Sequence, residues 1–99
     1  MPAYIIVNTR VSDPTRIQEY RDLAQQSVHQ YGGRYLVRGG PMLMLEGEYH
    51  PERLVVLEFD SLERIREWYA SEAYQKAKAA RDGIAQFDMI AVEGLDVPL

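Results

Sequence analysis

Three segments of the chain have the composition and length of β-strands. Residues 3–11 read AYIIVNTRV and residues 53–59 read RLVVLEF, so both alternating faces of each segment carry apolar side chains. Residues 86–93, which read QFDMIAVE, form the third run. Because successive side chains of a strand point to opposite faces, apolar residues on both faces indicate strands that are covered on both sides. The pattern predicts a strand in each segment.

A fourth, shorter strand is predicted within YGGRYLVRGG, which spans residues 31–40. Glycine pairs flank a core that alternates arginine with β-forming residues, and such pairs are typical of turns and close backbone approaches. The strand is therefore expected over 34–38. The chain from Met42 to Tyr49 is expected to be extended, with a bulge or turn at Gly47. Strict alternation places Arg34, Leu36 and Arg38 on one face of the strand, and Tyr35 and Val37 on the other.

The first amphipathic helix is predicted to begin at Asp13 and Pro14. Asp13 can cap the free backbone N–H groups, and Pro14 at the first helical position loses no hydrogen bond. Apolar residues then recur at three- and four-residue spacing, and the pair Gly32-Gly33 is expected to end the helix with one glycine in the left-handed conformation. The resulting apolar stripe comprises Ile17, Tyr20, Leu23, Ala24, Val28 and Tyr31.

A second helical segment is predicted from Asp60-Ser61 to Gly83. Asp60 is the expected cap, and Glu63 lies three residues further on, close to a capping-box arrangement. Ser71 is expected to kink or restart the helix. The apolar stripe comprises Leu62, Ile65, Trp68 and Tyr69 before this point, and Tyr74 and Ala77 after it.

The predicted order β-α-β-β-α-β describes a ferredoxin-like plait of the α+β class. In this plait, an antiparallel four-stranded sheet carries its helices on one face. Residues 1–99 are expected to form a single domain, with a short tail after Gly94. On the face without helices, roughly six apolar side chains, at about 1.5–3 kcal/mol each, are left in water in a monomer. We therefore expect a second copy to cover this face in a two-fold dimer.

Composition and charge narrow the possible partners. The net charge is −4 and no basic run occurs, which argues against a nucleic-acid partner because phosphate binding needs a clustered positive face. The chain has no cysteine, so disulfides, thiolate nucleophiles and sulfur-ligated metals are excluded. The N-terminal apolar run is too short for a signal peptide or a membrane span. A cytoplasmic protein without a membrane partner is expected.

Four motifs occur together: YGGRYLVRGG, Leu45-Glu46-Gly47, the strand Arg53–Phe59, and Trp68-Tyr69. In this combination they resemble domain-of-unknown-function family 1330, of the dimeric α+β barrel superfamily, and the resemblance covers nearly the whole chain. It implies a dimer whose two sheets close into a barrel with one cavity per subunit, and it implies no particular activity. Other members of the superfamily include cofactor-independent monooxygenases, haem-degrading enzymes and isomerases, which are analogies of fold only.

The polar residues of the predicted strands allow two interpretations. Asn8 and Glu58 have apolar neighbours on their face, so they are expected to enter the cavity if this face lines the barrel. A buried ion is costly unless it is paired, so Glu58 is expected to contact Arg34, Arg38 or Arg53. Such a pair either fixes the strand register, or leaves an arginine to hold a ligand carboxylate or enolate while Glu58 or a tyrosine handles a proton. Arg38 is the preferred ligand residue and Arg34 the preferred structural residue.

The histidines and the aromatic pair are weaker candidates. His50 lies in a turn that could reach the cavity mouth, whereas His29, near a helix end, is expected at the surface. Neither histidine stands at a metal-binding spacing from an acidic residue, so no metal site and no cofactor are expected. Trp68 and Tyr69 are more typical of a core stripe than of a ligand site.

The sequence thus predicts a homodimer that binds a small, partly apolar organic anion, such as a carboxylate or an aromatic compound, in a barrel cavity. Any chemistry is expected to be cofactor-independent acid–base work. Two alternatives stay open: a non-catalytic structural or regulatory dimer, and a cofactor-free monooxygenase-like enzyme. The candidate proton-transfer residues are Glu58 and His50, and the candidate ligand contacts are Arg38, Asn8, Arg34, Tyr69 and Trp68.

Overall fold

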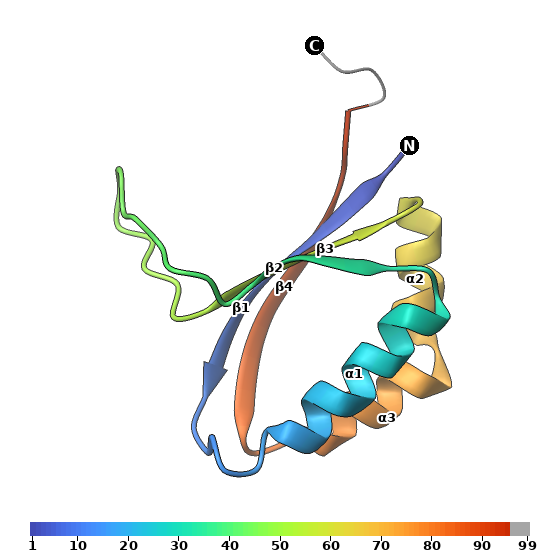
Figure 1. The fold of residues 1–99 in the computed structure, drawn as a ribbon, viewed down its shortest axis with the longest axis horizontal. Helices are drawn as coiled ribbons and strands as arrows, with labels where there is room; N and C mark the ends of the chain where they lie inside the picture. Colours follow the sequence, from blue (N-terminus) through green and yellow to red (C-terminus); the bar gives the residue numbers. More distant parts are fainter. Residues whose placement is uncertain (96–99) are drawn as a thin grey trace.

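The sheet has the strand order β2-β3-β1-β4, and each neighbouring pair is antiparallel. In the computed structural model, which describes residues 1–95, the three helices pack on one face of this sheet (Figure 1). This arrangement confirms the predicted ferredoxin-like α+β plait. Within residues 1–95, every helix is too short or too polar to cross a membrane. The elements are β1 (Ala3–Val11), α1 (Gln18–Gln30), β2 (Arg34–Arg38), β3 (Leu54–Phe59), α2 (Leu62–Ala70), α3 (Glu72–Ala80) and β4 (Ala85–Glu93).

The predicted strand boundaries are confirmed to within one residue, whereas the first helix starts later than predicted. α1 begins at Gln18 rather than at Pro14, because a turn comes first. In this turn the Asp13 carboxylate accepts hydrogen bonds from the Thr15 N–H at 3.2 Å and from the Thr15 hydroxyl at 2.6 Å. Residues 96–99, which include most of the predicted tail and the end of the predicted domain, lie outside the described part of the chain.

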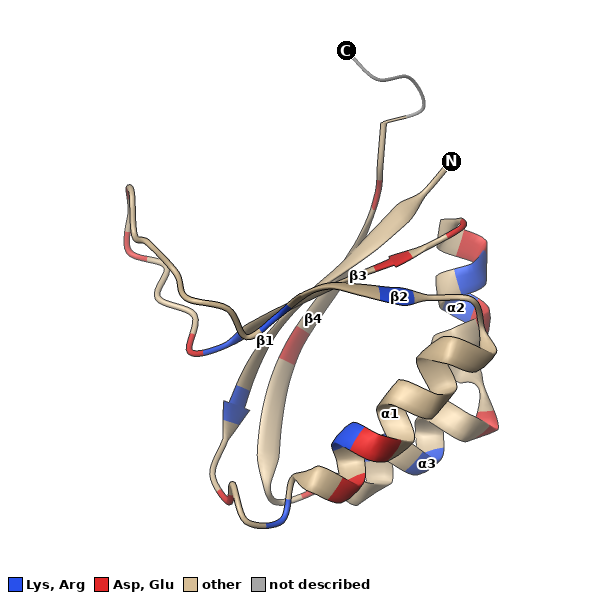
Figure 2. Ribbon diagram, in the orientation of Figure 1, with Lys and Arg blue, Asp and Glu red and all other residues tan. Residues whose placement is uncertain are grey.

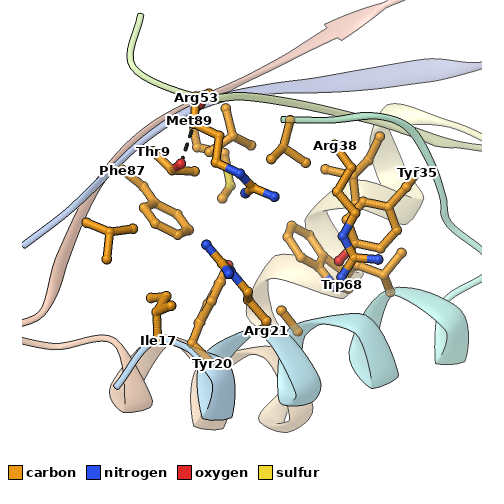
Figure 3. A pocket seen from close by; sticks show the side chains of 16 residues that line it. Thr9, Ile17, Tyr20, Arg21, Tyr35, Arg38, Arg53, Trp68, Phe87 and Met89 are labelled. Carbon is orange, nitrogen blue, oxygen red and sulfur yellow. Dashed lines mark hydrogen bonds between the residues drawn. The ribbon is translucent and has the colours of Figure 1, made fainter. Parts of the chain in front are cut away.

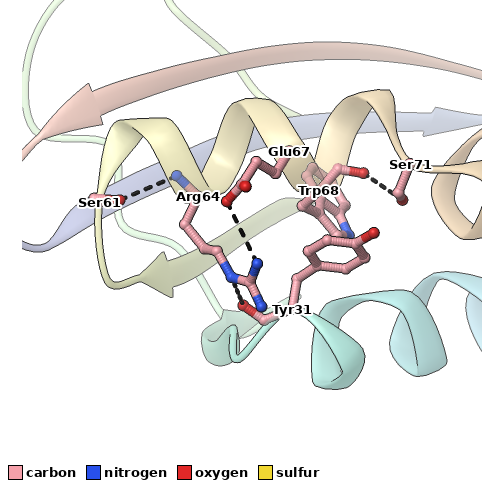
Figure 4. A network of polar contacts seen from close by, with 6 residues as sticks. All are labelled: Tyr31, Ser61, Arg64, Glu67, Trp68 and Ser71. Carbon is pink, nitrogen blue, oxygen red and sulfur yellow. Dashed lines mark hydrogen bonds and ion pairs between the residues drawn. The ribbon is translucent and has the colours of Figure 1, made fainter.

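The second helical segment is divided into α2 and α3 at Ser71, as predicted. Ser71 has an extended backbone (φ −66°, ψ 151°), and its hydroxyl caps the first turn of α3. The cap of α2 is Ser61 rather than the predicted Asp60, since the Ser61 hydroxyl accepts a hydrogen bond from the Arg64 N–H at 3.0 Å. Arg64 also joins α2 to the end of α1, because its Nε donates to the Tyr31 carbonyl at 3.0 Å (Figure 4).

A β-bulge in β2 changes the predicted orientation of its second arginine. The register shifts between Tyr35 and Val37, so Leu36 is an additional residue that β3 does not match. Beyond the bulge the alternation is reversed, and Arg38 lies on the helix-covered face with Tyr35. Arg34 precedes the bulge and lies on the other face. The prediction that Arg34 and Arg38 share a face is wrong, because strict alternation does not account for an extra residue.

The core lies between the helix-covered face of the sheet and the helices. Trp68 and Tyr74 extend into it from α2 and α3, and the centroids of their rings lie 4.2 Å apart. The Trp68 Nε1–H donates to the Ser27 hydroxyl at 3.0 Å, which links α2 to α1. Trp68 therefore has the core position that its place in the apolar stripe indicates. The sheet contributes Ala3, Ile5, Val7, Val55, Leu57 and Phe59 to this core.

The glycine pair after α1 makes a sharp turn and then a close approach to the core. Gly32 has a φ of 76°, the left-handed conformation predicted for one member of the pair. The Gly33 N–H donates to the Val28 carbonyl at 2.9 Å and closes the helix end. A Cβ atom at Gly33 would lie 2.5 Å from the ring of Phe59. Only glycine therefore lets β2 begin this close to the core.

Between β2 and β3 the chain leaves the sheet as an arm, residues 41–50. Every residue of the arm is exposed, and none belongs to a helix or strand, in agreement with the extended chain predicted there. The φ of 88° at Gly47 marks the predicted turn. Figure 1 shows the arm extending away from the side of the sheet on which the helices lie.

The open face of the sheet, which no helix among the described residues covers, carries both apolar and charged side chains. Figure 2 shows where the charged residues fall along the strands. Ile6 of β1 pairs with Ile90 of β4, and these side chains are 37% and 62% exposed. Val92, further along β4, is 46% exposed. The open face carries two ion pairs, Arg10 with Asp88 and Arg34 with Glu58.

Replacing Gly33 by alanine is expected to destabilise the protein, whereas the same change at Gly40 is expected to be nearly neutral. Gly33→Ala forces the Phe59 ring to move, which costs about 1–3 kcal/mol for an overpacked core position. Gly40 is the matched control, because its Cβ position meets no atom within 4 Å and its φ is not positive. Urea unfolding of both variants provides the measurement, and equal stabilities would contradict the proposed role of Gly33.

Candidate functional site

A cavity lies between the helix-covered face of the sheet and α1 (Figure 3). Its walls are largely aromatic and apolar, with Tyr20 from α1, Tyr35 from β2, Trp68 from α2, and Phe87 and Met89 from β4. About 50 Å³ is open to water-sized occupants, within about 590 Å³ of empty space that includes the open mouth. The cavity is thus narrow and open to solvent.

Three arginines from different elements enter this cavity. Arg21 comes from α1, Arg38 from the end of β2, and Arg53 from the residue before β3 (Figure 3). Arg38 donates from Nη2 to the Gln25 Oε1 at 2.9 Å, and its guanidinium lies 4.2 Å from the centroid of the Tyr35 ring. Among residues 1–95, no ion pair joins any of these three arginines to a carboxylate.

The three arginines of this cluster carry like charges, which repel one another. Burial lowers the pKa of the Arg53 guanidinium, and the positive charges of Arg21 and Arg38 lower it further. The backbone of Arg53 is fixed, because its carbonyl accepts a hydrogen bond from the Thr9 N–H at 2.9 Å. A fixed group of like charges in a partly apolar space attracts an anion. The arrangement can therefore hold a carboxylate or a similar anion at the cavity mouth.

The tyrosines of the cavity supply neutral hydroxyl groups. Burial raises the pKa of Tyr20 strongly, and the neighbouring Tyr74, whose hydroxyl lies 3.2 Å from that of Tyr20, raises it further. Burial also raises the pKa of Tyr35. Both groups stay protonated over the physiological range and can donate or accept hydrogen bonds. Among the lining residues described, no carboxylate and no histidine is available as a base.

The predicted site residues are distributed over four parts of the molecule: the cavity, the open face, the arm and the surface of α2. Arg38 and Trp68 line the cavity. Arg34 and Glu58 lie on the open face, where Arg34 Nε donates to Glu58 Oε1 at 2.6 Å. Of the three arginines considered for Glu58, Arg34 is thus the one that pairs with it. The remaining predicted positions are Asn8, His50 and Tyr69.

Asn8, His50 and Tyr69 all lie outside the cavity. Asn8 is buried on the open face, and its Oδ1 accepts a hydrogen bond from the Glu52 N–H at 3.0 Å, which fixes the end of the arm. His50 is exposed on the arm. Tyr69 is 38% exposed on α2, and its hydroxyl accepts a hydrogen bond from Lys78 Nζ at 2.9 Å. Within the described part of the chain, no group of three or more potential metal ligands is present.

The sequence interpretation missed Arg21 altogether and considered Arg53 only as a partner for Glu58. A signal for Arg21 exists, because it stands four residues after Ile17 and three before Ala24, within the apolar stripe of the first helix. A charge in such a stripe either extends to solvent or enters a cavity. No local signal exists for Arg53, whose approach to the other arginines depends on the fold.

Comparisons with known proteins identify a family and a fold. The family model described as "Domain of unknown function (DUF1330)" matches residues 2–95. No curated protein matches the chain.

Solved structures resemble the chain at low sequence identity. A protein of unknown function from Rhodopseudomonas palustris has a TM-score of 0.75 at 18% identity, with 97% of this chain and 84% of that chain covered. A dimeric ferredoxin-like protein of unknown function from Jannaschia sp. CCS1 has a TM-score of 0.68 at 13% identity, with 95% and 100% covered. SnoaB, a cofactor-independent oxygenase from Streptomyces nogalater, has a TM-score of 0.56 at 9% identity, with 97% and 95% covered. At these identities the similarity shows the fold alone.

Because the pKa of Tyr20 is raised in the folded protein, its contribution to stability is present below about pH 10 and is lost as the pH rises further. Above that pH the unfolded chain loses the proton and the folded protein keeps it. We expect the free energy of unfolding to fall by up to about 1.4 kcal/mol per pH unit from this residue.

The Tyr20→Phe variant should show a shallower fall in alkaline solution than the wild type, although it is less stable at neutral pH because Tyr74 loses its hydroxyl partner. Tyr69→Phe, which is partly exposed on α2 and lies outside both the cavity and the arm, is the control and should keep the wild-type slope. Urea unfolding at a series of alkaline pH values measures these slopes. Equal slopes for the wild type and Tyr20→Phe would refute the assignment.

Proposed function

The chain belongs to the DUF1330 family, and we propose that it binds a small organic anion in the cavity between its sheet and α1. The supporting observation is the convergence of Arg21, Arg38 and Arg53 on an aromatic cavity without a carboxylate partner among the described residues. Like charges repel one another, and burial removes part of the hydration of Arg53. A bound anion offsets both costs, so the cluster is better suited to holding a ligand than to stabilising the fold.

The ligand best suited to this cavity has a carboxylate or enolate beside an apolar, preferably aromatic, body. Guanidinium groups bind planar carboxylates through paired, charge-assisted hydrogen bonds. The same lining includes the rings of Tyr20, Tyr35 and Phe87, which offer apolar contacts to the body of a ligand. The tyrosine hydroxyls offer further hydrogen bonds. Because only about 50 Å³ of the cavity is open to water-sized occupants, we expect the anionic group to enter the cavity and much of the ligand body to lie in its open mouth.

Binding is better supported than a particular reaction. Proton abstraction needs a base near the ligand, and the described residues lining the cavity include no carboxylate or histidine. Glu58 lies on the opposite face of the sheet and His50 on the arm, so either one acts on this ligand only where a second copy brings it to the cavity. The shared fold with SnoaB does not favour oxygenase chemistry over simple binding.

The open face supports the further proposal that the protein is a homodimer. Its apolar centre, with Ile6, Ile90 and Val92 partly exposed, lies between charged margins, which is the usual composition of a protein interface. A second copy related by a two-fold axis presents the same surface and covers all of these side chains together. A dimeric protein with the same fold is known from Jannaschia sp. CCS1.

Anion binding can be tested by a thermal-shift panel of aromatic and aliphatic carboxylates, each paired with its neutral alcohol. We expect benzoate to stabilise the protein and benzyl alcohol, which has the same ring, to do so much less. At about 100 times the dissociation constant, a ligand adds about 2.7 kcal/mol of stability. Arg53→Gln should weaken benzoate binding roughly tenfold or more, because it removes one charge-assisted hydrogen bond.

The control for this experiment is Arg16→Gln, which removes one positive charge from the exposed turn before α1 and should leave binding unchanged. Arg53→Gln should not lower the stability of the ligand-free protein, since it relieves repulsion within the cluster. Equal effects of benzoate and benzyl alcohol, or equal losses in the two variants, would count against an arginine-based anion site. A panel without any binding carboxylate would favour the structural-dimer alternative.

The dimer can be tested by sedimentation of the wild type and of Ile90→Glu. The substitution places a charge at the apolar centre of the open face, and a buried unpaired charge is strongly unfavourable. We expect the wild type to sediment as a dimer at micromolar concentration and Ile90→Glu as a monomer. Ala79→Glu adds the same charge to an exposed position of α3 and should remain dimeric. A monomeric wild type would refute the proposal.

A further inference from the structure

The arm has unusually little contact with the rest of its own chain. Five large apolar side chains are exposed on it, and Leu43 and Leu45 are 81% and 86% exposed. Among the described residues, no backbone–backbone hydrogen bond involves residues 41–50. Exposed apolar side chains and unpaired backbone groups together are typical of a segment that docks on another surface. The five side chains are Met42, Leu43, Met44, Leu45 and Tyr49.

The two ends of the arm, in contrast, are held firmly against the sheet. The Gly39 N–H donates to the Leu54 carbonyl at 2.8 Å. On the returning segment, the Glu52 N–H donates to Asn8 Oδ1 at 3.0 Å. The direction in which the arm leaves the sheet is therefore fixed, and Figure 1 shows that it leaves on the side opposite the helices.

The length of the arm exceeds the distance that separates two packed sheets. Half of its residues run out and half return, so five extended residues give a reach of roughly 17 Å. Sheets that pack face to face lie about 10 Å apart. When the open faces of two copies pack together, an arm of this length therefore extends beyond the level of the partner's sheet. In a two-fold pair, each copy's arm lies against the other copy, and both apolar arms are covered.

The same two chain segments that carry the arm also carry two arginines of the cavity. Arg38 is the last residue of β2 and precedes the arm. Arg53 lies after the arm and is the residue before β3. The segments are in contact, because a Cβ atom at Gly39, whose φ is 75°, would lie 2.5 Å from Arg53 Nε. Docking of the arm therefore acts, through this contact, on the side chains that set the spacing of the arginine cluster.

We propose that residues 41–50 dock on a second copy of this chain, and that docking fixes Arg38 and Arg53 so that dimerisation and anion binding strengthen each other. The docking does not depend on the proposed anion site, whereas the coupling rests on it. A second copy is the best-supported partner for the arm, because the arm leaves the sheet on the side of the open face. The arm and the centre of the open face also both carry exposed apolar side chains. Because each copy carries one anion site, linkage requires that saturating anion tightens dimerisation by the square of the factor by which dimerisation tightens binding at each site.

Docking is tested with the double variant Leu43→Ser, Leu45→Ser. Both side chains are more than four-fifths exposed within one copy, so the change should leave the fold of that copy intact. We expect sedimentation to show a dimer dissociation constant at least about tenfold weaker, since two buried leucines are lost per copy. The double variant Glu46→Gln, Glu48→Gln keeps the apolar surface of the arm and should retain the wild-type constant.

Hydrogen exchange gives a second, direct readout of docking. The amides of residues 42–50 should exchange freely in the monomeric variant and be protected in the wild-type dimer. Unprotected arm amides in a wild-type dimer, or an unchanged dimer constant in the leucine variant, would overturn the docking proposal.

Coupling is tested by titrating benzoate into the wild type and the leucine variant, at protein concentrations where the first is dimeric and the second monomeric. We expect several-fold weaker benzoate binding by the monomer, and a dimer constant of the wild type that tightens by the square of that factor in saturating benzoate, because each dimer holds two sites. Equal benzoate affinities in monomer and dimer would overturn the coupling and leave the anion site intact. If no form of the protein binds benzoate or any other carboxylate of the panel, the anion site itself fails, and the sedimentation result still decides the docking.

Discussion

Apolar side chains on both faces of the central strands β1 and β3 are the constraint on which the rest of the structure depends. On one face, helices α1, α2 and α3 cover these strands and leave a narrow cavity beside α1. On the other face, no helix of the described part of the chain covers Ile6 and its neighbour Ile90. Exposed apolar surface is unfavourable in water, so the same strands that line a cavity under the helices favour a covering partner on their other face.

The bulge at Leu36 decides how charge is divided between these two faces. Before the bulge, Arg34 faces outwards and forms an ion pair with Glu58. After it, Arg38 faces the helices and joins an arginine cluster that has no carboxylate among the described lining residues. With unbroken alternation, both arginines would lie on the open face and the cavity would lose one of its cations. One additional residue in β2 thus separates an arginine in an ion pair from an arginine that lines the cavity.

Local signals explain which parts of the fold were predictable from the sequence. Strand alternation, the glycine at 32 and the cap at Ser71 act within a few residues, so the elements, the helix end and the division of the second helix follow from the sequence. The face of Arg38 does not follow, because a bulge is set by the pairing of β2 with β3 rather than by β2 itself. The arginine cluster depends on tertiary structure in the same way, since Arg21 and Arg53 are distant in sequence and meet only when α1 packs on the sheet.

The position of the cluster relative to the arm gives a physical reason why ligand and partner should act on one another. Arg38 and Arg53 stand on the two chain segments that continue into the arm, and the like charges of their guanidinium groups repel one another. On the proposed function, an anion between the two groups restricts their side chains, and a partner that holds the arm restricts the same side chains from the other end. Both therefore reduce the same conformational freedom, and whichever binds first lowers the entropic cost of the second.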